Sequence, residues 1–202
     1  MATAKMERKR ACVTGATGYV GSMLVKSLLE KGYADNATGR DPANSKKVSH
    51  LLDLQVLGDL KLFKADLMEE GSFDDAINGC DFVFHVATPM ILDSKDPEND
   101  MIKPAINGTL DVLKSCVKTK TVKRVVYTSS VAAVARKKLT RIGHVLTEES
   151  WSDVEYLTSK KQLSWESWFL FWKTTMAKGK KKALAAITAA IPALPESSVA
   201  VI

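Results

Sequence analysis

Short apolar runs alternate with longer amphipathic segments along the first 130 residues of the chain. The short runs predict strands at 11–13, 34–39, 60–63, 81–86 and 121–128. The longer segments carry apolar residues at helical spacing and predict helices at 19–31, 44–54, 72–77 and 98–118. Gly32 and Gly79 follow two of these helices, where glycine commonly ends a helix.

This alternation favours one class of fold. Strands that alternate with helices build a parallel sheet with helices on both of its faces. We therefore expect an α/β fold, a Rossmann-type doubly wound parallel sheet with the strand order 3-2-1-4-5. The domain is predicted to span residues 1–161.

The alternation stops after residue 161. Aromatic residues crowd together between 165 and 172, a basic run covers 178–182, and an alanine-rich stretch with two prolines follows. This composition predicts that the fold is truncated and that 162–202 is a divergent, poorly ordered tail in place of the rest of the catalytic and substrate region. A partner-binding or membrane-surface helix is the alternative, which the prolines and the shortness of the tail disfavour.

Composition narrows the class of protein. The 202 residues, 46% hydrophobic and 26% charged, are those of an ordinary soluble globular chain. The three cysteines form no Cys-x-x-Cys pair, so we expect no metal site and no disulfide framework. Without a secretory signal or a run of 18 apolar residues, the expected location is cytoplasmic, with no stable membrane insertion. The net charge of +6 comes without a basic face interleaved with aromatics, which predicts no nucleic-acid partner.

A glycine-rich turn lies between the first predicted strand and the first predicted helix. Gly15, Gly18 and Gly21 fit the pattern G-x-x-G-x-x-G, which in this position is typical of a dinucleotide-binding loop. Gly15 allows the tight turn, Gly18 lets the backbone approach a pyrophosphate, and Gly21 lets the helix pack close to the sheet. The N–H groups at the helix start would hold the anion. The wide spacing of the first two glycines is typical of short-chain dehydrogenases/reductases.

The residues after the second predicted strand indicate which dinucleotide binds. Enzymes that use NAD place an acid there for the ribose hydroxyl, whereas NADP enzymes leave room for a 2′-phosphate beside a basic residue. Arg40 stands at this point, followed by Lys46 and Lys47, and a guanidinium can bind a phosphate through two parallel hydrogen bonds. We therefore expect NADPH. Asp41 keeps NAD open as the alternative, because an acid here can instead face the ribose.

Further motifs follow one another in a fixed order along residues 8–161. They are Gly39-Arg40-Asp41-Pro42, Ala65-Asp66-Leu67, Gly79-Cys-Asp-Phe-Val-Phe-His-Val-Ala-Thr-Pro89, Asn107-Gly108-Thr109 and Val122-Lys-Arg-Val-Val-Tyr-Thr-Ser-Ser130. Together with the glycine loop, this set resembles the plant dihydroflavonol reductase and anthocyanidin reductase family, which are extended short-chain dehydrogenases. The resemblance implies an NADPH-dependent oxidoreductase that transfers hydride to a flavonoid-like small molecule.

The resemblance also implies cofactor contacts along the chain. The expected pyrophosphate contacts are Thr17, Gly18, Tyr19 and Val20. Arg40 and Lys47 would contact the 2′-phosphate, and Asp66 and Leu67 the adenine. The segment that would line the nicotinamide ribose is Val86, Ala87 and Thr88.

Two residues of the second strand depart from the family. Asp35 and Gly39 stand where the family usually has apolar residues. A buried carboxylate without a partner costs several kcal/mol or shifts its pKa. A strand glycine costs roughly 0.5–1 kcal/mol. We therefore expect a weakened second strand, which is the strand that aims Arg40.

The catalytic residues of the family are only partly present. Ser130 matches the catalytic serine, which hydrogen-bonds the substrate oxygen. The family also needs a Tyr and a Lys four residues apart, where the Lys lowers the Tyr pKa and the Tyr exchanges a proton. Trp165 matches the Trp that precedes this pair, which puts Ser167 and Phe171 at the positions of the pair. Neither side chain can perform the proton transfer.

A substitute pair occurs earlier in the chain. Tyr156 and Lys160 have the required four-residue spacing after Ser130, and this spacing puts two side chains on one helix face. The alternative is a surface Tyr and a solvated Lys in a loop. Two functions therefore stay open: an NADPH-dependent flavonoid reductase, or a catalytically inactive NADP(H)-binding truncated variant. A sugar-nucleotide epimerase shares the fold, but the flavonoid-type segment 85–90 disfavours it.

Overall fold

The computed structural model describes residues 8–89, 96, 99–100, 103–129, 152 and 199–201. The chain divides into two compact units, of which the first comprises 1–88 with 108–126 and the second comprises 89–107 with 127–202. The first unit carries the sheet and the segments expected to bind a dinucleotide. The second unit holds the first residues of α4 (Lys103–Thr119) and the short strand β6 (Val199–Val201).

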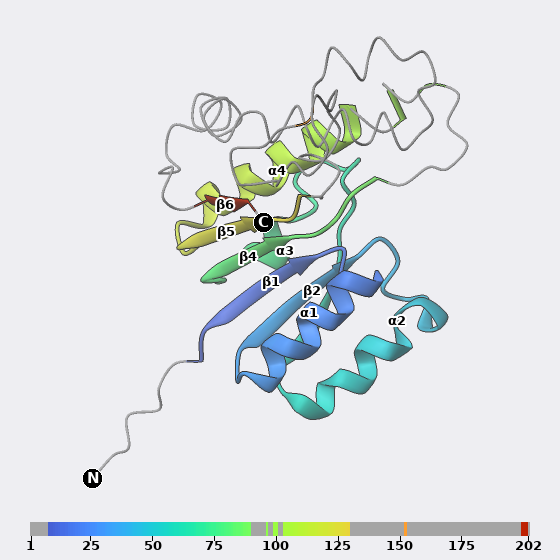
Figure 1. Ribbon diagram of the computed structural model, residues 1–202, viewed down its shortest axis with the longest axis vertical. Helices are drawn as coiled ribbons and strands as arrows, with labels where there is room; N and C mark the ends of the chain where they lie inside the picture. The colour runs from blue at the N-terminus through green and yellow to red at the C-terminus, as the bar shows by residue number, and fades with distance from the viewer. Residues whose placement is uncertain are drawn as a thin grey trace, which may run out of the picture. The chain divides into compact units, whose positions relative to one another are not determined.

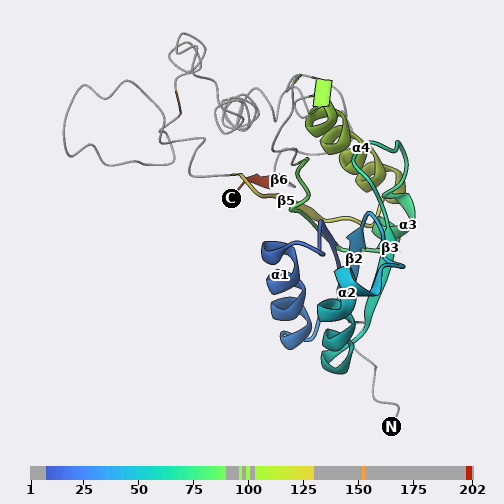
Figure 2. The ribbon, with the colours of Figure 1, turned by 90° about the vertical axis from the view of Figure 1, so that its right-hand side faces the viewer.

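The sheet has the predicted topology. Five of its six strands are β1 (Arg10–Thr14), β2 (Ala34–Gly39), β3 (Leu60–Lys64), β4 (Phe82–His85) and β5 (Arg124–Tyr127). They follow the order β3-β2-β1-β4-β5, and β1 pairs in parallel with both β2 and β4 while β2 pairs in parallel with β3 (Figures 1 and 2). The prediction of a Rossmann-type doubly wound parallel sheet is confirmed.

Helices cover both faces of this sheet. They are α1 (Tyr19–Glu30), α2 (Ser45–Leu52) with the 3-10 helix η1 (Asp53–Leu57), α3 (Asp74–Ile77) and α4. Figures 1 and 2 show α1 and α2 against one face, with α3 and α4 against the other. The fourth helix, predicted at 98–118, comprises Lys103–Thr119 among the described residues, and residues 99–100 also have a helical backbone.

The two faces of β2 bury different kinds of side chain. Ala37 belongs to an apolar cluster with Ala11 and with α1 residues such as Val25 and Leu29. Asn36 points to the opposite face, because side chains alternate along a strand. Every residue of β2 is buried, as expected for a central strand covered on both sides.

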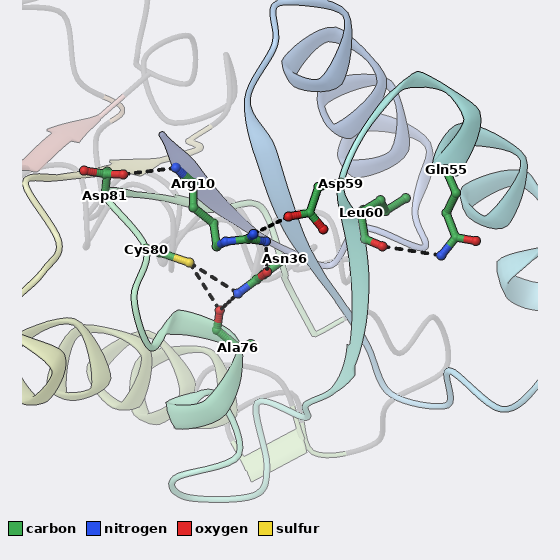
Figure 3. Close-up of polar contacts among 8 residues, drawn as sticks. All are labelled: Arg10, Asn36, Gln55, Asp59, Leu60, Ala76, Cys80 and Asp81. Carbon is green, nitrogen blue, oxygen red and sulfur yellow. Dashed lines mark hydrogen bonds and ion pairs between the residues drawn. The ribbon is translucent and has the colours of Figure 1, made fainter. Parts of the chain in front are cut away.

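A polar network joins the amino ends of the strands (Figure 3). The Arg10 guanidinium donates to Asn36 Oδ1 at 2.9 Å and forms an ion pair with Asp59. Asn36 Nδ2 donates in turn to the carbonyl of Ala76 at 2.7 Å, and the Arg10 backbone N–H donates to Asp81 Oδ2 at 3.0 Å. These contacts tie β1, β2, α3 and the start of β4 together at the edge opposite the strand ends described next.

Candidate functional site

The glycine loop lies at the carboxyl edge of the sheet, between β1 and α1. Gly15 has φ +69°, a left-handed conformation that favours glycine. A Cβ added to Gly15 would lie 2.8 Å from Ala87 Cα, so the loop approaches the end of β4 too closely for any side chain. A Cβ on Gly21 would lie 2.4 Å from the Gly15 carbonyl oxygen. Both glycines are therefore required by close backbone contact.

The amino end of α1 directly follows this loop. Gly18 is the N-cap and supplies no side-chain cap, and the first turn carries no acidic residue. The first N–H groups of an α-helix have no partner within the helix, and they attract anions. Tyr19 and Val20 are exposed. The first turn of α1 is therefore open to a phosphate group.

Hydrogen bonds join the glycine loop to the end of β2. The N–H of Ala16 donates to the Thr38 carbonyl at 3.0 Å, and the N–H of Gly15 donates to Thr38 Oγ1 at 3.3 Å. A Cβ on Gly39 would lie 2.6 Å from Thr17 Cγ2, so the Thr17 methyl group fills the space above this glycine. The loop is thus anchored beside the residue that follows β2, which is Arg40.

The basic residues expected at the 2′-phosphate lie on the surface. Arg40 and Lys47 are both exposed, Arg40 directly after β2 and Lys47 in the first turn of α2. Neither forms an ion pair with any residue that the structure describes. Their charges are consequently available to an anion from solution.

Asp35 is a buried polar residue on the apolar face of β2. Its side chain lies on the face of Ala37, and both carboxyl oxygens are buried without a hydrogen-bond partner among the described residues. Burial raises the pKa of Asp35 to about 8, against the opposing attraction of Arg10. The strand nevertheless keeps its register with β3 along its length, from Asp35 opposite Leu60 to Gly39 opposite Lys64.

The loop after β3 carries the residues expected at the adenine. Asp66 and Leu67 are half-buried. Ser72 closes this loop, because its hydroxyl accepts from the Asp66 N–H at 3.0 Å and donates to the Asp66 carbonyl at 2.8 Å. The Asp66 carboxylate accepts from the Met68 N–H at 3.0 Å. The loop therefore holds its shape through its own hydrogen bonds.

Residues of α4 support the same loop. A Cβ on Gly108 would lie 2.7 Å from Leu67 Cβ, so glycine lets the helix contact the loop. The Asp111 carboxylate accepts from the N–H of Gly71 at 3.0 Å. Neither contact was predicted from the sequence, although Asn107-Gly108-Thr109 stood out as a motif.

The segment after β4 is held by the last residue of β1. The Thr14 hydroxyl oxygen accepts from the N–H of Val86 at 3.1 Å and from the N–H of Ala87 at 3.0 Å. Thr88 follows, half-buried. The structure thus gathers four of the expected cofactor segments at one edge, since the carboxyl ends of parallel strands meet there.

The three predicted catalytic residues, Ser130, Tyr156 and Lys160, lie outside the described residues, as do Ser167 and Phe171. Their roles stay predictions. Sequence reasoning missed Thr14 and Thr38, which tie the glycine loop and the segment after β4 to the strands. The available signal was a hydroxyl residue at or near the end of a buried strand, directly before a glycine of the loop or opposite one.

Two further findings concern what the described part of the chain contains. None of its helices is both long and apolar enough to cross a bilayer. Within the same residues, no cluster of three or more His, Cys, Asp or Glu side chains is arranged to hold a metal ion.

Comparison with known proteins shows that this chain is similar to dehydrogenases and reductases. The model of the 3-beta hydroxysteroid dehydrogenase/isomerase family matches residues 12–170. The chain is 61% identical over 158 residues to an anthocyanidin reductase ((2S)-flavan-3-ol-forming) of Vitis vinifera, and 56% identical over 160 residues to dihydroflavonol 4-reductase of Arabidopsis thaliana. These matches cover 78% and 79% of this chain but 47% and 41% of the relatives. The chain therefore spans less than half the length of these two relatives.

Solved structures show the same similarity. The vestitone reductase of alfalfa (Medicago sativa L.) superposes with a TM-score of 0.66 at 39% identity, over 84% of this chain and 51% of the other. A yeast methylglyoxal/isovaleraldehyde reductase complexed with NADPH superposes with a TM-score of 0.73 at 23% identity, over 95% of this chain and 56% of the other. The second likeness is one of fold alone.

Proposed function

Because this chain belongs to the 3-beta hydroxysteroid dehydrogenase/isomerase family, we propose that it binds NADP(H) at the carboxyl edge of its sheet. Its similarity to anthocyanidin and dihydroflavonol reductases confirms the resemblance inferred from its motifs. The observation that carries the proposal is the glycine loop, which opens an uncapped helix and contacts Gly39, the residue before the exposed Arg40.

The residues of this edge fit a dinucleotide phosphate. Gly15 and Gly21 remove the side chains that would fill the loop, and the uncapped first turn of α1 offers N–H groups to a pyrophosphate. Arg40 and Lys47 supply positive charge for a 2′-phosphate. Asp66 and Leu67 would border the adenine, and the backbone of 86–88 the nicotinamide ribose. When bound, the nicotinamide supplies the hydride.

Ligand-induced stabilisation of the purified chain tests the proposal. NADPH at 100 times its dissociation constant stabilises a one-site protein by about 2.7 kcal/mol. For a chain of this size we expect the melting temperature to rise by roughly 5–10 °C. NADH at the same concentration, the matched control, is expected to give a much smaller rise. A chain whose melting temperature responds to neither nucleotide does not have the proposed function.

Arg40→Ala is expected to weaken NADPH binding without changing the fold. Hydrogen bonds to charged groups contribute about 1.5–3 kcal/mol, so the NADPH dissociation constant should rise roughly 10-fold to 100-fold. NADH lacks the 2′-phosphate, and its dissociation constant should change less than about threefold. Titration calorimetry with both nucleotides measures the two effects. Lys31→Ala, at an exposed basic residue at the opposite end of α1 from the glycine loop, is the control. An equal loss for NADPH and NADH would contradict the assignment of Arg40.

We extend the proposal to the reaction. The chain is an oxidoreductase that uses NADPH to reduce a small molecule, and the names of its relatives support a flavonoid-like substrate. Ser130 would donate a hydrogen bond to the developing oxyanion, Tyr156 would supply the proton, and Lys160 would lower the Tyr156 pKa.

Tyr156→Phe is the substitution that separates turnover from binding. If Tyr156 supplies the proton, this change should lower kcat at least about 100-fold, within the range expected for general acid catalysis. The NADPH dissociation constant should stay within about twofold. Oxidation of NADPH with an anthocyanidin or a dihydroflavonol measures the rate. Tyr33→Phe, at a residue packed against the apolar core, is the control for loss of a tyrosine hydroxyl.

A second function is favoured by one observation, the presence of Ser167 and Phe171 where the family has its Tyr and Lys. In that case the chain binds NADP(H) without turnover. A clear thermal shift with NADPH, combined with no NADPH oxidation by the unsubstituted chain, would support this second function over the reductase.

A further inference from the structure

His85 occupies a buried position between three elements of the first unit. It is the last residue of β4, and it is 2% exposed. Its ring Nδ1 lies 2.9 Å from Thr14 Oγ1 on β1, and its Nε2 lies 3.1 Å from Thr109 Oγ1 on α4. The imidazole therefore bridges the two hydroxyl groups.

The contacts of Thr14 decide which ring nitrogen carries the proton. A hydroxyl oxygen has two lone pairs and one proton to donate. Thr14 Oγ1 already accepts from the N–H groups of Val86 and Ala87. Both lone pairs are thus used, so the contact with His85 must be one in which Thr14 donates and Nδ1 accepts. His85 is then a neutral imidazole with its proton on Nε2, where it donates to Thr109.

The hydrogen bond between Thr14 and His85 also sets the orientation of the Thr14 hydroxyl group. Because the Thr14 proton points to His85, its lone pairs point to the segment that follows β4. That segment also meets the glycine loop, since a Cβ on Gly15 would lie 2.8 Å from Ala87 Cα. The backbone of Val86 and Ala87 is consequently held between the glycine loop and a single hydroxyl group.

We propose that His85 is a positioning residue for the nicotinamide end of the site: as the Nε2–H tautomer it orients the Thr14 hydroxyl, which holds the Val86 and Ala87 backbone in place for the cofactor. The inference rests on the proposed function, because it takes that backbone as part of the cofactor site. It assigns His85 no contact with cofactor or substrate.

Two variants at position 85 separate positioning from simple packing. In His85→Asn the amide oxygen takes the place of Nδ1 and can accept from Thr14, whereas His85→Leu leaves Thr14 without an acceptor. We expect His85→Leu to raise the NADPH dissociation constant roughly tenfold and His85→Asn to stay within about threefold of the unsubstituted chain. Thr14→Val should match His85→Leu, and Thr14→Ser should match the unsubstituted chain.

Nitrogen-15 NMR of the cofactor-free, unsubstituted chain reads the tautomer directly and needs no variant to fold. We expect a proton on Nε2 and none on Nδ1 at neutral pH. In a separate experiment, hydrogen exchange at the Val86 and Ala87 amides should be slow in the unsubstituted chain and faster in His85→Leu. A proton on Nδ1 would overturn the inference. So would a His85→Leu variant that binds NADPH as tightly as the unsubstituted chain. If the unsubstituted chain binds no NADPH, the proposed function fails and the positioning role fails with it. The NMR experiment still tests the hydrogen-bond assignment of His85 in that case, because it is made without the cofactor.

Discussion

Asp35→Val is expected to stabilise the protein by about 4 kcal/mol more at pH 8 than at pH 5. The folded state holds this carboxyl with a pKa of about 8, whereas the ordinary value is 3.8. Between these two values the folded chain keeps the proton that the unfolded chain has lost. Stability therefore falls as pH rises from about 4 to about 8, by about 1.4 kcal/mol for each pH unit. Valine has no proton to lose, so the variant avoids this loss.

Urea unfolding at several pH values measures the effect. The difference between the two curves isolates Asp35, because other groups titrate in both chains. Asp35→Asn is the matched control, because it removes this titration but keeps a buried polar group. The difference in stability between Asp35→Asn and Asp35→Val should therefore not change with pH in this window, and Asp35→Asn should be the less stable of the two. Parallel curves for Asp35→Val and the unsubstituted chain between pH 5 and pH 8 would show that this carboxyl is solvated or paired.

Gly21→Ala is expected to lower the melting temperature of the cofactor-free chain by roughly 6–12 °C. The new Cβ would lie 2.4 Å from the Gly15 carbonyl oxygen and 2.8 Å from Ala16 Cα, both backbone atoms that cannot rotate away. Overpacking of this kind costs about 1–3 kcal/mol, and the upper end applies to a backbone clash. Because the clash displaces the loop from α1, NADPH binding should weaken at the same time.

Gly18→Ala provides the contrast within the same loop. Its Cβ would meet only the Gly15 carbonyl oxygen at 3.4 Å, an ordinary contact, and Gly18 has φ −83°. Alanine is less favourable than glycine at an N-cap by about 1 kcal/mol or less, so we expect the melting temperature of the cofactor-free chain to fall by less than about 4 °C. NADPH affinity should nevertheless fall, because the methyl group stands where the pyrophosphate approaches. Equal melting temperatures for Gly18→Ala and Gly21→Ala would refute the packing role of Gly21.

The parts of the fold that were predictable from the sequence are those with local signals. The glycine loop is contiguous, and its helix begins at Tyr19 as its spacing indicated. Strand order followed from the alternation of strands and helices, because a doubly wound sheet has few alternatives. The free-energy cost of burying Asp35 was also predictable. A central parallel strand is buried on both faces, so any carboxyl group within it loses its hydration.

The contacts that complete the site were not predictable, because each depends on how distant elements pack. Asp111 reaches Gly71 across 40 residues of sequence, and Thr14 reaches Val86 across 72. Nothing in the local sequence around either partner marks the pair. Such pairings follow from the tilt of α4 and the stagger of β1 against β4, which hydrophobic spacing does not determine.

The position of β3 at one end of the strand order has a consequence for how copies of this chain meet in concentrated solution. A strand at the rim of a sheet offers unpaired backbone groups to the rim of another molecule, which invites sheet extension. β3 carries exposed lysines at both Lys61 and Lys64. Joining two such rims would bring like charges together and remove them from water. The same strand that completes the hydrogen bonding of β2 is therefore protected by its own side chains against adding a further strand from a neighbour.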